Sequence, residues 1–283
     1  TFTGLAPGDY WLGIRNSTGY CEVYEGDAVS ISERPHKVII DVVVEQPSDC
    51  DIDDGEITLL AQGNGVSEYS IDGGTSWQSN RIFRDLTPGS YEPMVRNIDG
   101  TCQKPYGESF TLTYPPRPVF EDVIAEATSD CGVSDGMIEV IAGEGIGSFQ
   151  YSINDGNSWQ NSAVFTGLNA TAYGKLAIRN SDGTCYEEYN GSVQVAQPPK
   201  PTFDDIDIDQ PSDCGLNDGT IEIIADDGIG SYQYTFDGGI SWQTQDELNN
   251  LEPGSYALGI RNSDGTCAIF ENDPTQLSYP PEP

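Results

Sequence analysis

A repeat of about 82 residues constrains what this chain can fold into more than any other feature. The decapeptide YSIDGGTSWQ at 69–78 returns as YSINDGNSWQ at 151–160 and as YTFDGGISWQ at 234–243. Its tryptophans are spaced by 82 and 83 positions, and the cysteines recur at intervals of 81 to 83. Self-similarity at one period indicates a tandem array. The period is too long for a solenoid unit and suits a small self-contained β domain.

Proline-rich segments mark the joints between the repeats. They read RPHK, YPPRP, QPPKP and YPPEP, at 34–37, 114–118, 197–201 and 279–283. Such segments favour polyproline II geometry and act as short, fairly stiff spacers. Residues 1–34 match only the second half of a repeat, so we expect the chain to be a piece of a longer protein. We predict the C-terminal half of a truncated repeat at 1–34, followed by complete repeats at 35–117, 118–200 and 201–283.

Each repeat has the pattern of an all-β domain. In the third repeat, alternating or β-branched stretches predict strands at 203–210, 219–226, 232–236, 240–243 and 256–262. Asp237-Gly238-Gly239 lies between two of them as a tight hairpin turn. The stretch TQDELNNL at 244–251 is the one candidate for a helical turn.

A second recurring motif narrows the fold. LEPGSY at 251–256 returns as LAPGDY, LTPGSY and LNATAY. Its buried leucine, Pro-Gly turn and inward tyrosine resemble the strand E to strand F corner of fibronectin-type and immunoglobulin-like sandwiches, where such a tyrosine ties the corner down. We therefore expect tandem immunoglobulin- and fibronectin-III-like β-sandwiches in an elongated array.

The repeated decapeptide resembles the Asp-box hairpin of sialidases and many other β proteins. The matching residues are Ser70, Asp72, Gly74 and Trp77; Ser152, Asn154, Gly156 and Trp159; and Thr235, Asp237, Gly239 and Trp242. The resemblance implies a structural role, because in that motif the Asp and Ser side chains bond the turn backbone and the Trp packs beneath them. A sialidase would also need a cluster of arginines, and each repeat has one invariant arginine, at Arg15, Arg96, Arg179 and Arg261. We expect these arginines to face outward and to pair with Asp or Glu for under about 1 kcal/mol each. No set of nucleophile, base and orienting group recurs, so no catalysis is predicted.

Whole repeats resemble the SprB repeat of very large surface adhesins of gliding Bacteroidota. The shared features are a cysteine, a strand opened by Asp-Gly, a Gly-rich stretch, the Leu-x-x-Gly-x-Tyr corner, and an Asp-Gly-x-Cys turn before a closing strand and proline. The family turn has a plain Gly-Cys, whereas here a residue intervenes, as in Gly100-Thr101-Cys102. The resemblance implies type IX secretion and display on the outer membrane, in an extracellular setting.

Seven cysteines, two per complete repeat, indicate disulfides formed in an oxidising compartment. Pairing within repeats is favoured: Cys50–Cys102, Cys131–Cys185 and Cys214–Cys267, which leaves Cys21 for a partner upstream. Pairing between repeats would give Cys50–Cys185 and Cys131–Cys267. Pairing across linkers would give Cys21–Cys50, Cys102–Cys131 and Cys185–Cys214. A seven-strand sandwich would favour bonds between neighbouring repeats, because a disulfide tolerates only about 7 Å between Cα atoms.

The charge of −34, from 46 acidic and 12 basic residues, argues against nucleic acid or anionic membrane surfaces as partners. No apolar run is long enough to span a bilayer. His36 is the single histidine, so a zinc cluster and histidine-based catalysis are not expected. Aspartates in the loops after the first strands are the best candidate calcium ligands, at Asp49, Asp54, Asp130, Asp135, Asp213 and Asp218. The favoured interpretation gives them a turn-forming role with no cofactor.

These observations predict a structural stalk segment of a large repetitive adhesin or surface filament, involved in cell-surface attachment or gliding motility. Its partners would be other repeats of the same long chain, surface polysaccharide or the substratum, and further copies bundled into a homo-oligomeric fibre. The alternative is a repeated polysaccharide-binding module of a secreted protein, in which the exposed aromatics Tyr20, Tyr106 and Tyr189 grip the ligand and repetition gives avidity.

Overall fold

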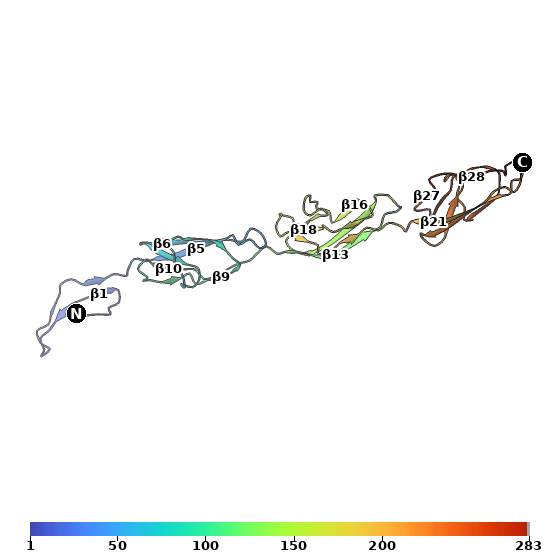
Figure 1. Cartoon of the computed structure of the whole chain (residues 1–283). Helices are drawn as coiled ribbons and strands as arrows, with labels where there is room; N and C mark the ends of the chain where they lie inside the picture. Colours follow the sequence, from blue (N-terminus) through green and yellow to red (C-terminus); the bar gives the residue numbers. More distant parts are fainter. Residues whose placement is uncertain (282–283) are drawn as a thin grey trace. The chain divides into compact units, whose positions relative to one another are not determined.

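The computed structural model describes residues 1–281, so Glu282 and Pro283 of the predicted third repeat lie outside the described residues. The chain divides into two compact units, Thr1–Pro115 and Pro116–Pro283, and the division falls inside the proline segment 114–118. All regular elements of the described chain are β-strands (Figure 1). None of the described residues belongs to a helix long and apolar enough to cross a membrane.

Three antiparallel sheets build the third repeat. The first sheet contains β21 (Pro201–Asp209), β22 (Gly219–Asp227) and β24 (Glu247–Leu251). The second contains β23 (Tyr232–Thr235), β26 (Gly259–Asn262) and β27 (Ile269–Phe270). The third pairs β25 (Gly254–Tyr256) with β28 (Thr275–Leu277).

The other two complete repeats have the same three sheets. The second repeat contains β13 (Pro118–Glu126), β14 (Gly136–Glu144) and β16 (Val164–Leu168); β15 (Phe149–Ser152), β18 (Ala177–Asn180) and β19 (Glu187–Glu188); and β17 (Ala172–Tyr173) with β20 (Val193–Gln194). The first repeat contains β5 (Lys37–Glu45), β6 (Gly55–Gly63) and β8 (Ile82–Leu86); β7 (Ser67–Ser70), β10 (Met94–Asn97) and β11 (Lys104–Pro105); and β9 (Gly89–Tyr91) with β12 (Phe110–Leu112).

The N-terminal segment forms only part of this pattern. β1 (Gly8–Tyr10) pairs with β4 (Val29–Ile31), and β2 (Gly13–Ile14) pairs with β3 (Val23–Tyr24). Within residues 1–34 no counterpart of the β21–β22–β24 sheet is present. Ile14 is therefore 76% exposed, whereas Ile260 at the equivalent position is 0% exposed.

Each complete repeat buries its own core between the first and second sheets. In β22 the sequence alternates, so Ile221 and Ile223 face inward with 0% and 1% exposure while Glu222 faces solvent. They pack in one cluster with Tyr234 and Ile260 of the second sheet. Burying one such isoleucine stabilises the fold by about 1.5–3 kcal/mol. The first and second repeats have equivalent clusters around Ile57 and Ile138.

The tyrosine corner forms in every repeat and in the N-terminal segment. In each case the tyrosine hydroxyl donates to the carbonyl oxygen four residues earlier. The bonds are Tyr10 to Ala6 at 2.6 Å, Tyr91 to Thr87 at 2.6 Å, Tyr173 to Asn169 at 3.3 Å and Tyr256 to Glu252 at 2.9 Å. Together with the two-layer core, this corner makes each complete repeat an immunoglobulin- and fibronectin-III-like sandwich.

The helical turn predicted at 244–251 is wrong, because β24 occupies most of that stretch. Leu251 pairs with Gly219 and Leu248 pairs with Ile221, so a β-bulge adds one residue to β24. The bulge turns both leucines toward the core although they are three positions apart, which imitates a helical spacing. Asn250 takes the positive φ of 59° that the bulge needs, and asparagine tolerates this conformation well. The stretch predicted as strand 240–243 contributes only an isolated bridge from Gln243 to Tyr234.

Candidate functional site at the repeat junction

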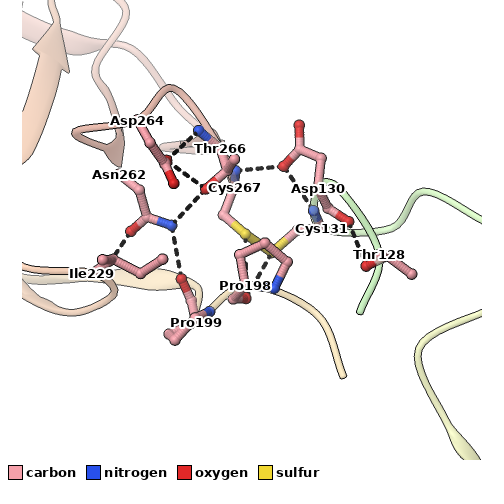
Figure 2. Close-up of a disulfide and its surroundings, with 10 residues drawn as sticks. All are labelled: Thr128, Asp130, Cys131, Pro198, Pro199, Ile229, Asn262, Asp264, Thr266 and Cys267. Atoms are coloured by element: carbon pink, nitrogen blue, oxygen red, sulfur yellow. Dashed lines mark hydrogen bonds between the residues drawn. A yellow bond between two sulfur atoms is a disulfide. The ribbon is translucent and has the colours of Figure 1, made fainter. Parts of the chain in front are cut away.

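A disulfide joins the second repeat to the third. Cys131 lies in the loop after β13, and Cys267 lies in the turn before β27. Their Cα atoms are 4.8 Å apart, and their sequence separation is 136. Figure 2 shows the bond between the loop drawn in green and the turn drawn in orange. The two repeats are therefore connected twice, by the linker and by this covalent bond.

This bond shows that the favoured pairing within repeats is wrong, since Cys131 does not pair with Cys185 and Cys267 does not pair with Cys214. The Cys131–Cys267 pairing of the between-repeat scheme is confirmed. Cys185 is nevertheless disulfide-bonded.

The first repeat also departs from in-repeat pairing. Cys50 is disulfide-bonded, whereas Cys102 is a free, half-buried thiol, so the Cys50–Cys102 bond is not formed. Cys21 and Cys214 are free and exposed. The pairing across linkers is therefore wrong as well, because each of its three bonds would need one of these free cysteines.

The two cysteines of one repeat lie at its opposite ends. Cys214 approaches the C-terminal linker of the third repeat, with its Sγ 3.9 Å from the Pro280 carbonyl oxygen. Cys267 of the same repeat approaches the N-terminal linker, with its Sγ 3.4 Å from the Pro198 carbonyl oxygen. The Sγ of Cys131 lies 3.4 Å from that same carbonyl. A disulfide within the repeat would have to span its length, whereas one to the neighbouring repeat spans only the linker.

One carboxylate holds both halves of the junction. Asp130 Oδ1 accepts the backbone amide of Cys131 at 2.7 Å and that of Cys267 at 2.6 Å. The Asp130 carbonyl also accepts the hydroxyl of Thr128 at 2.9 Å. Hydrogen bonds to an ionised acceptor are about twice as strong as neutral ones. Asp130 therefore orients the two cysteine backbones toward each other independently of the sulfur bond.

A buried asparagine ties the linker to the third repeat. Asn262 is 0% exposed. Its Nδ2 donates to the Pro199 carbonyl at 2.9 Å and to Thr266 Oγ1 at 2.9 Å, and its Oδ1 accepts the Ile229 amide at 2.9 Å. Figure 2 shows these bonds beside the disulfide. The side chain thus fixes the linker, the turn that carries Cys267 and the Gly-rich loop at one point.

The equivalent asparagines of the other two repeats differ in whether they bond the preceding linker. Asn180 of the second repeat donates to the Pro116 carbonyl at 3.0 Å, and its Oδ1 accepts the Ile146 amide at 2.9 Å. Asn97 of the first repeat donates to Thr101 at 3.2 Å, but its buried Oδ1 has no partner among the described residues. The linker bond is therefore present at Asn180 and Asn262 and is not seen at Asn97.

The decapeptide hairpins are held by their own side chains. In the first, Asp72 accepts the Ser76 amide with both oxygens at 2.9 Å and the Ser70 hydroxyl at 2.7 Å. The Trp77 indole nitrogen donates to the Gly74 carbonyl at 2.8 Å, and Gly74 takes a φ of 88° that favours glycine. Asp237 likewise accepts the Ser241 amide and the Thr235 hydroxyl. Asn154 Oδ1 accepts the Ser158 amide and the Ser152 hydroxyl. Gly156 and Gly239 also have positive φ, and Trp242 donates to Gly239 at 3.2 Å.

These bonds lower the pKa of the hairpin aspartates. Burial raises the pKa of Asp72, but the hydrogen bonds from Ser76, and then from Ser70 and the Thr75 amide, outweigh it and lower the pKa to about 2. The side chain and amide of Ser241 lower the pKa of Asp237 even further. The first and third hairpins are thus held by charged acceptors, and the second by a neutral amide.

The invariant arginines stack on the hairpin tryptophans. Each guanidinium carbon lies 4.2 Å from a tryptophan ring centroid, in the pairs Arg96–Trp77, Arg179–Trp159 and Arg261–Trp242. The prediction of acidic partners holds for Arg96, whose Nε donates to Glu68 at 2.8 Å. It is wrong for Arg179 and Arg261, whose Nε atoms donate to Gln150 and Gln233 at 2.7 Å. The arginine therefore clamps the hairpin onto the second sheet, with about 0.5–1 kcal/mol from each cation–π contact.

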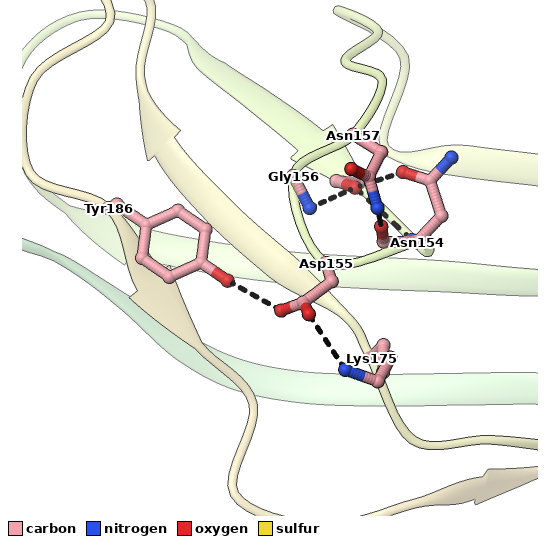
Figure 3. A network of polar contacts seen from close by, with 7 residues as sticks. Asn154, Asp155, Gly156, Asn157, Lys175 and Tyr186 are labelled. Carbon is pink, nitrogen blue, oxygen red and sulfur yellow. Dashed lines mark hydrogen bonds and ion pairs between the residues drawn. The ribbon is translucent and has the colours of Figure 1, made fainter.

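The second repeat has an additional polar network on its hairpin. Lys175 Nζ donates to Asp155 at 2.7 Å, and the Tyr186 hydroxyl donates to the other Asp155 oxygen at 3.3 Å (Figure 3). The hydrogen bond and charge of Lys175 lower the pKa of Asp155. The side chains of Lys175 and Asp155 are 65% and 40% exposed, so solvent screens this pair and it adds little to stability.

The candidate calcium ligands bond to loop backbone. Asp54, Asp135 and Asp218 accept the amides of Ser48, Ser129 and Ser212 at 2.8–2.9 Å. Asp49, Asp130 and Asp213 accept the amide of the following cysteine at 2.7 Å. The serine bonds lower the pKa of Asp54, Asp135 and Asp218. Both sets therefore shape the loop that carries the first cysteine of each repeat.

The aromatics proposed to grip polysaccharide are not all exposed. Tyr106 is half-buried against Phe110, with ring centroids 5.8 Å apart, and Tyr189 is half-buried against Phe120 at 5.1 Å. Tyr20 is 74% exposed. The prediction of one exposed aromatic per repeat is therefore wrong for Tyr106 and Tyr189.

The sheets, the tyrosine corners and the junction define a class: tandem β-sandwich repeats of immunoglobulin and fibronectin III type. Neither protein-family models nor curated proteins give a match to the chain. Among solved structures, the three N-terminal domains of the bacteriophage RB49 Highly Immunogenic Outer Capsid protein share 11% identity at a TM-score of 0.35, over 86% of this chain and 97% of that chain. Sidekick-1 immunoglobulin domains 1–5 share 10% at 0.32, over 96% and 66%. The C-terminal 282-residue fragment of intimin, in complex with the intimin-binding domain of its translocated receptor, shares 12% at 0.30, over 58% and 67%.

Proposed function

We propose that this chain is a load-bearing stalk segment of a large repetitive extracellular adhesin or surface filament, and that its repeats belong with the SprB repeats of gliding and attachment systems. The observation that carries the proposal is the Cys131–Cys267 disulfide between consecutive repeats. The bond joins two repeats that each pack a hydrophobic core of their own. It strengthens the connection between them.

The position of the bond determines where tension would travel. A pull on the two chain ends would reach Cys131 through β13 and leave through the segment after Cys267. Residues 132–266, which include strands β14 to β26, lie inside the closed loop and would carry little force. Most of both cores is thereby shielded from tension, whereas β13 and the segment with β27 and β28 remain on the load path.

The redox state and charge support an extracellular location. Stable disulfides form in oxidising compartments, and Cys267 is only 1% exposed. A net charge of −34 keeps such a surface soluble and separate from anionic neighbours. Display on the outer membrane and export by the type IX route are part of this proposal through the SprB resemblance.

Single-molecule stretching tests the load-bearing role. The chain is tethered at its ends in a background with serine at the other five cysteines, so that only Cys131–Cys267 can lock it. We expect the oxidised chain to withhold the extension of the closed loop, roughly 450–490 Å at 3.3–3.6 Å per residue, and to release it after reduction. Equal total extensions before and after reduction would contradict the proposal. The matched control replaces Cys131 and Cys267 by serine as well and should give the long extension under both conditions.

A further inference from the structure

The chain contains two Asn-Gly pairs, Asn64-Gly65 and Asn190-Gly191. Asparagine is a thermolabile residue. It is most reactive before glycine, because a residue without a Cβ lets its own amide nitrogen approach the asparagine side chain. Both asparagines are exposed. The two pairs have the same chemistry in an unfolded chain, so a difference between them has to come from the fold.

In the second repeat the glycine amide is occupied. Gly191 donates to the Tyr189 carbonyl oxygen at 3.0 Å, which closes a three-residue turn around Asn190. The Tyr189 ring also lies against the glycine, since a Cβ built at Gly191 would be 3.2 Å from Tyr189 Cε1. To attack the asparagine side chain, this nitrogen has to break a hydrogen bond and leave a fixed turn.

In the first repeat the glycine amide is open. Within residues 1–281 the Gly65 nitrogen has no hydrogen-bond acceptor. A Cβ built at Gly65 would meet only the Pro35 carbonyl oxygen, at 4.0 Å. Gly65 also has a φ of 105°, a conformation that glycine adopts without strain. The nitrogen is therefore accessible in the folded chain.

A shorter loop explains why this amide is open. Three residues separate β6 from β7, whereas four separate β14 from β15 and β22 from β23. In the longer loops the amides of Ile146 and Ile229 donate at 2.9 Å to Oδ1 of Asn180 and Asn262. The equivalent oxygen of Asn97 is buried without a partner among the described residues. The first repeat therefore leaves both an acceptor and a loop amide unpaired.

We propose that Asn64-Gly65 is a site of spontaneous deamidation and that the fold protects Asn190-Gly191. The Gly65 nitrogen attacks Cγ of Asn64 and loses its proton, and the side-chain nitrogen leaves as ammonia. The product is a five-membered imide. Water then opens the imide at one of its two carbonyls and yields aspartate or isoaspartate. The net reaction consumes one water molecule and releases one ammonia.

The modified loop lies beside the proline segment 34–37. Gly63 pairs with Lys37 in the ladder between β6 and β5, and Gly65 lies near the Pro35 carbonyl. Either product adds a negative charge at this position, and isoaspartate also adds one atom to the main chain. The modification thus accumulates with the age of the protein and changes the loop next to this linker.

Peptide mapping of the folded, oxidised chain tests the proposal. The chain is incubated in mildly alkaline buffer, and mass spectrometry follows the peptides that contain Asn64 and Asn190. We expect Asn64 to convert about fivefold faster than Asn190, the factor that corresponds to about 1 kcal/mol for the hydrogen bond at Gly191. Isoaspartate, detected by enzymatic methylation, should form together with aspartate because the imide opens at both carbonyls.

Two controls separate the fold from the sequence. In the reduced chain unfolded in guanidinium chloride, both pairs should convert at equal rates. In the folded chain, Asn64→Gln should abolish the reaction at this position and leave the rate at Asn190 unchanged. Equal rates in the folded chain, a faster Asn190, no conversion at Asn64, a rate ratio that persists on unfolding, or aspartate without isoaspartate would each overturn the proposal.

Discussion

Asp130 Oδ1 lies 2.6 Å from the backbone nitrogen of Cys267, a residue 137 positions further along the chain. The same oxygen lies 2.7 Å from the nitrogen of Cys131. One oxygen of a loop aspartate thus bonds the backbones of two consecutive repeats. The disulfide beside it is a covalent staple between the same two repeats.

Removing the staple should destabilise each of the two repeats it joins. The two cores between Cys131 and Cys267 unfold separately. While one repeat stays folded, the disulfide closes a loop of about 67 residues in the unfolded chain of the other repeat. In the chain-entropy model such a loop contributes roughly 4 kcal/mol. We expect the Cys131→Ser/Cys267→Ser variant to lose about that much in the free energy of unfolding of the second and third repeats, measured by urea titration. An unchanged midpoint would show that the bond does not constrain either repeat, and the first repeat provides the internal control.

The linker asparagine should matter where it reaches the linker. Asn262→Ala removes three hydrogen bonds of a fully buried side chain, so we expect a loss of about 3 kcal/mol. Asn97→Ala removes one 3.2 Å bond and deletes an oxygen that has no partner among the described residues, so the loss should be at most about 1 kcal/mol. Thermal and urea unfolding of both variants measure the difference. Equal losses would contradict the role assigned to the Pro199 contact.

Acid should loosen the first and third hairpins and spare the second. The pKa of Asp72 is about 2 in the folded chain, below its ordinary value of 3.8. Because the folded pKa is the lower one, the stabilisation is complete above pH about 4 and is lost as pH falls toward 2. We expect Asp72→Asn to flatten the pH dependence of stability between pH 5 and 2, and Asn154→Asp to introduce such a dependence in the second repeat. Urea unfolding at several pH values measures both, and parallel pH profiles for all variants would refute the assignment.

Salt should weaken the coupling between Arg96 and Glu68 more than the coupling between Arg261 and Gln233. Arg96 and Glu68 have side chains 24% and 23% exposed with nitrogen and oxygen 2.7 Å apart, so their coupling is partly Coulombic. A double-mutant cycle should give about 1 kcal/mol at low salt and clearly less at 1 M NaCl, where the Debye length is about 3 Å. The Arg261–Gln233 pair has the same geometry with a neutral partner, so its coupling should change little with salt. Identical salt responses would mean that charge has no part in the Arg96 clamp.

Much of this fold could be predicted from period and alternation. The repeat of the tryptophans identified the hairpins, alternation identified the strand at 203–210, β-branched residues identified the strand at 219–226, and the Leu-Pro-Gly-Tyr motif identified the corner. Each of these signals is local, and each reflects one element's contact with its own core. The bulge at Asn250 was missed because two leucines three apart resemble a helical turn.

The junction was harder to predict because it depends on where the repeat ends lie in space. Spacing alone does not say that Cys214 and Cys267 occupy opposite ends of one sandwich, and this arrangement decides the pairing. The arginine clamp had a usable signal that was overlooked: Glu68, Gln150 and Gln233 occupy one position in every repeat, immediately before the tyrosine of the hairpin. Register places each of them opposite its arginine on the neighbouring strand.

Peptide mapping of the oxidised chain under non-reducing conditions tests the stapled-repeat account most directly. The account predicts one cross-linked species that joins the peptide containing Cys131 to the peptide containing Cys267 and disappears on reduction. A species that joins Cys131 to Cys185, or Cys214 to Cys267, would contradict it.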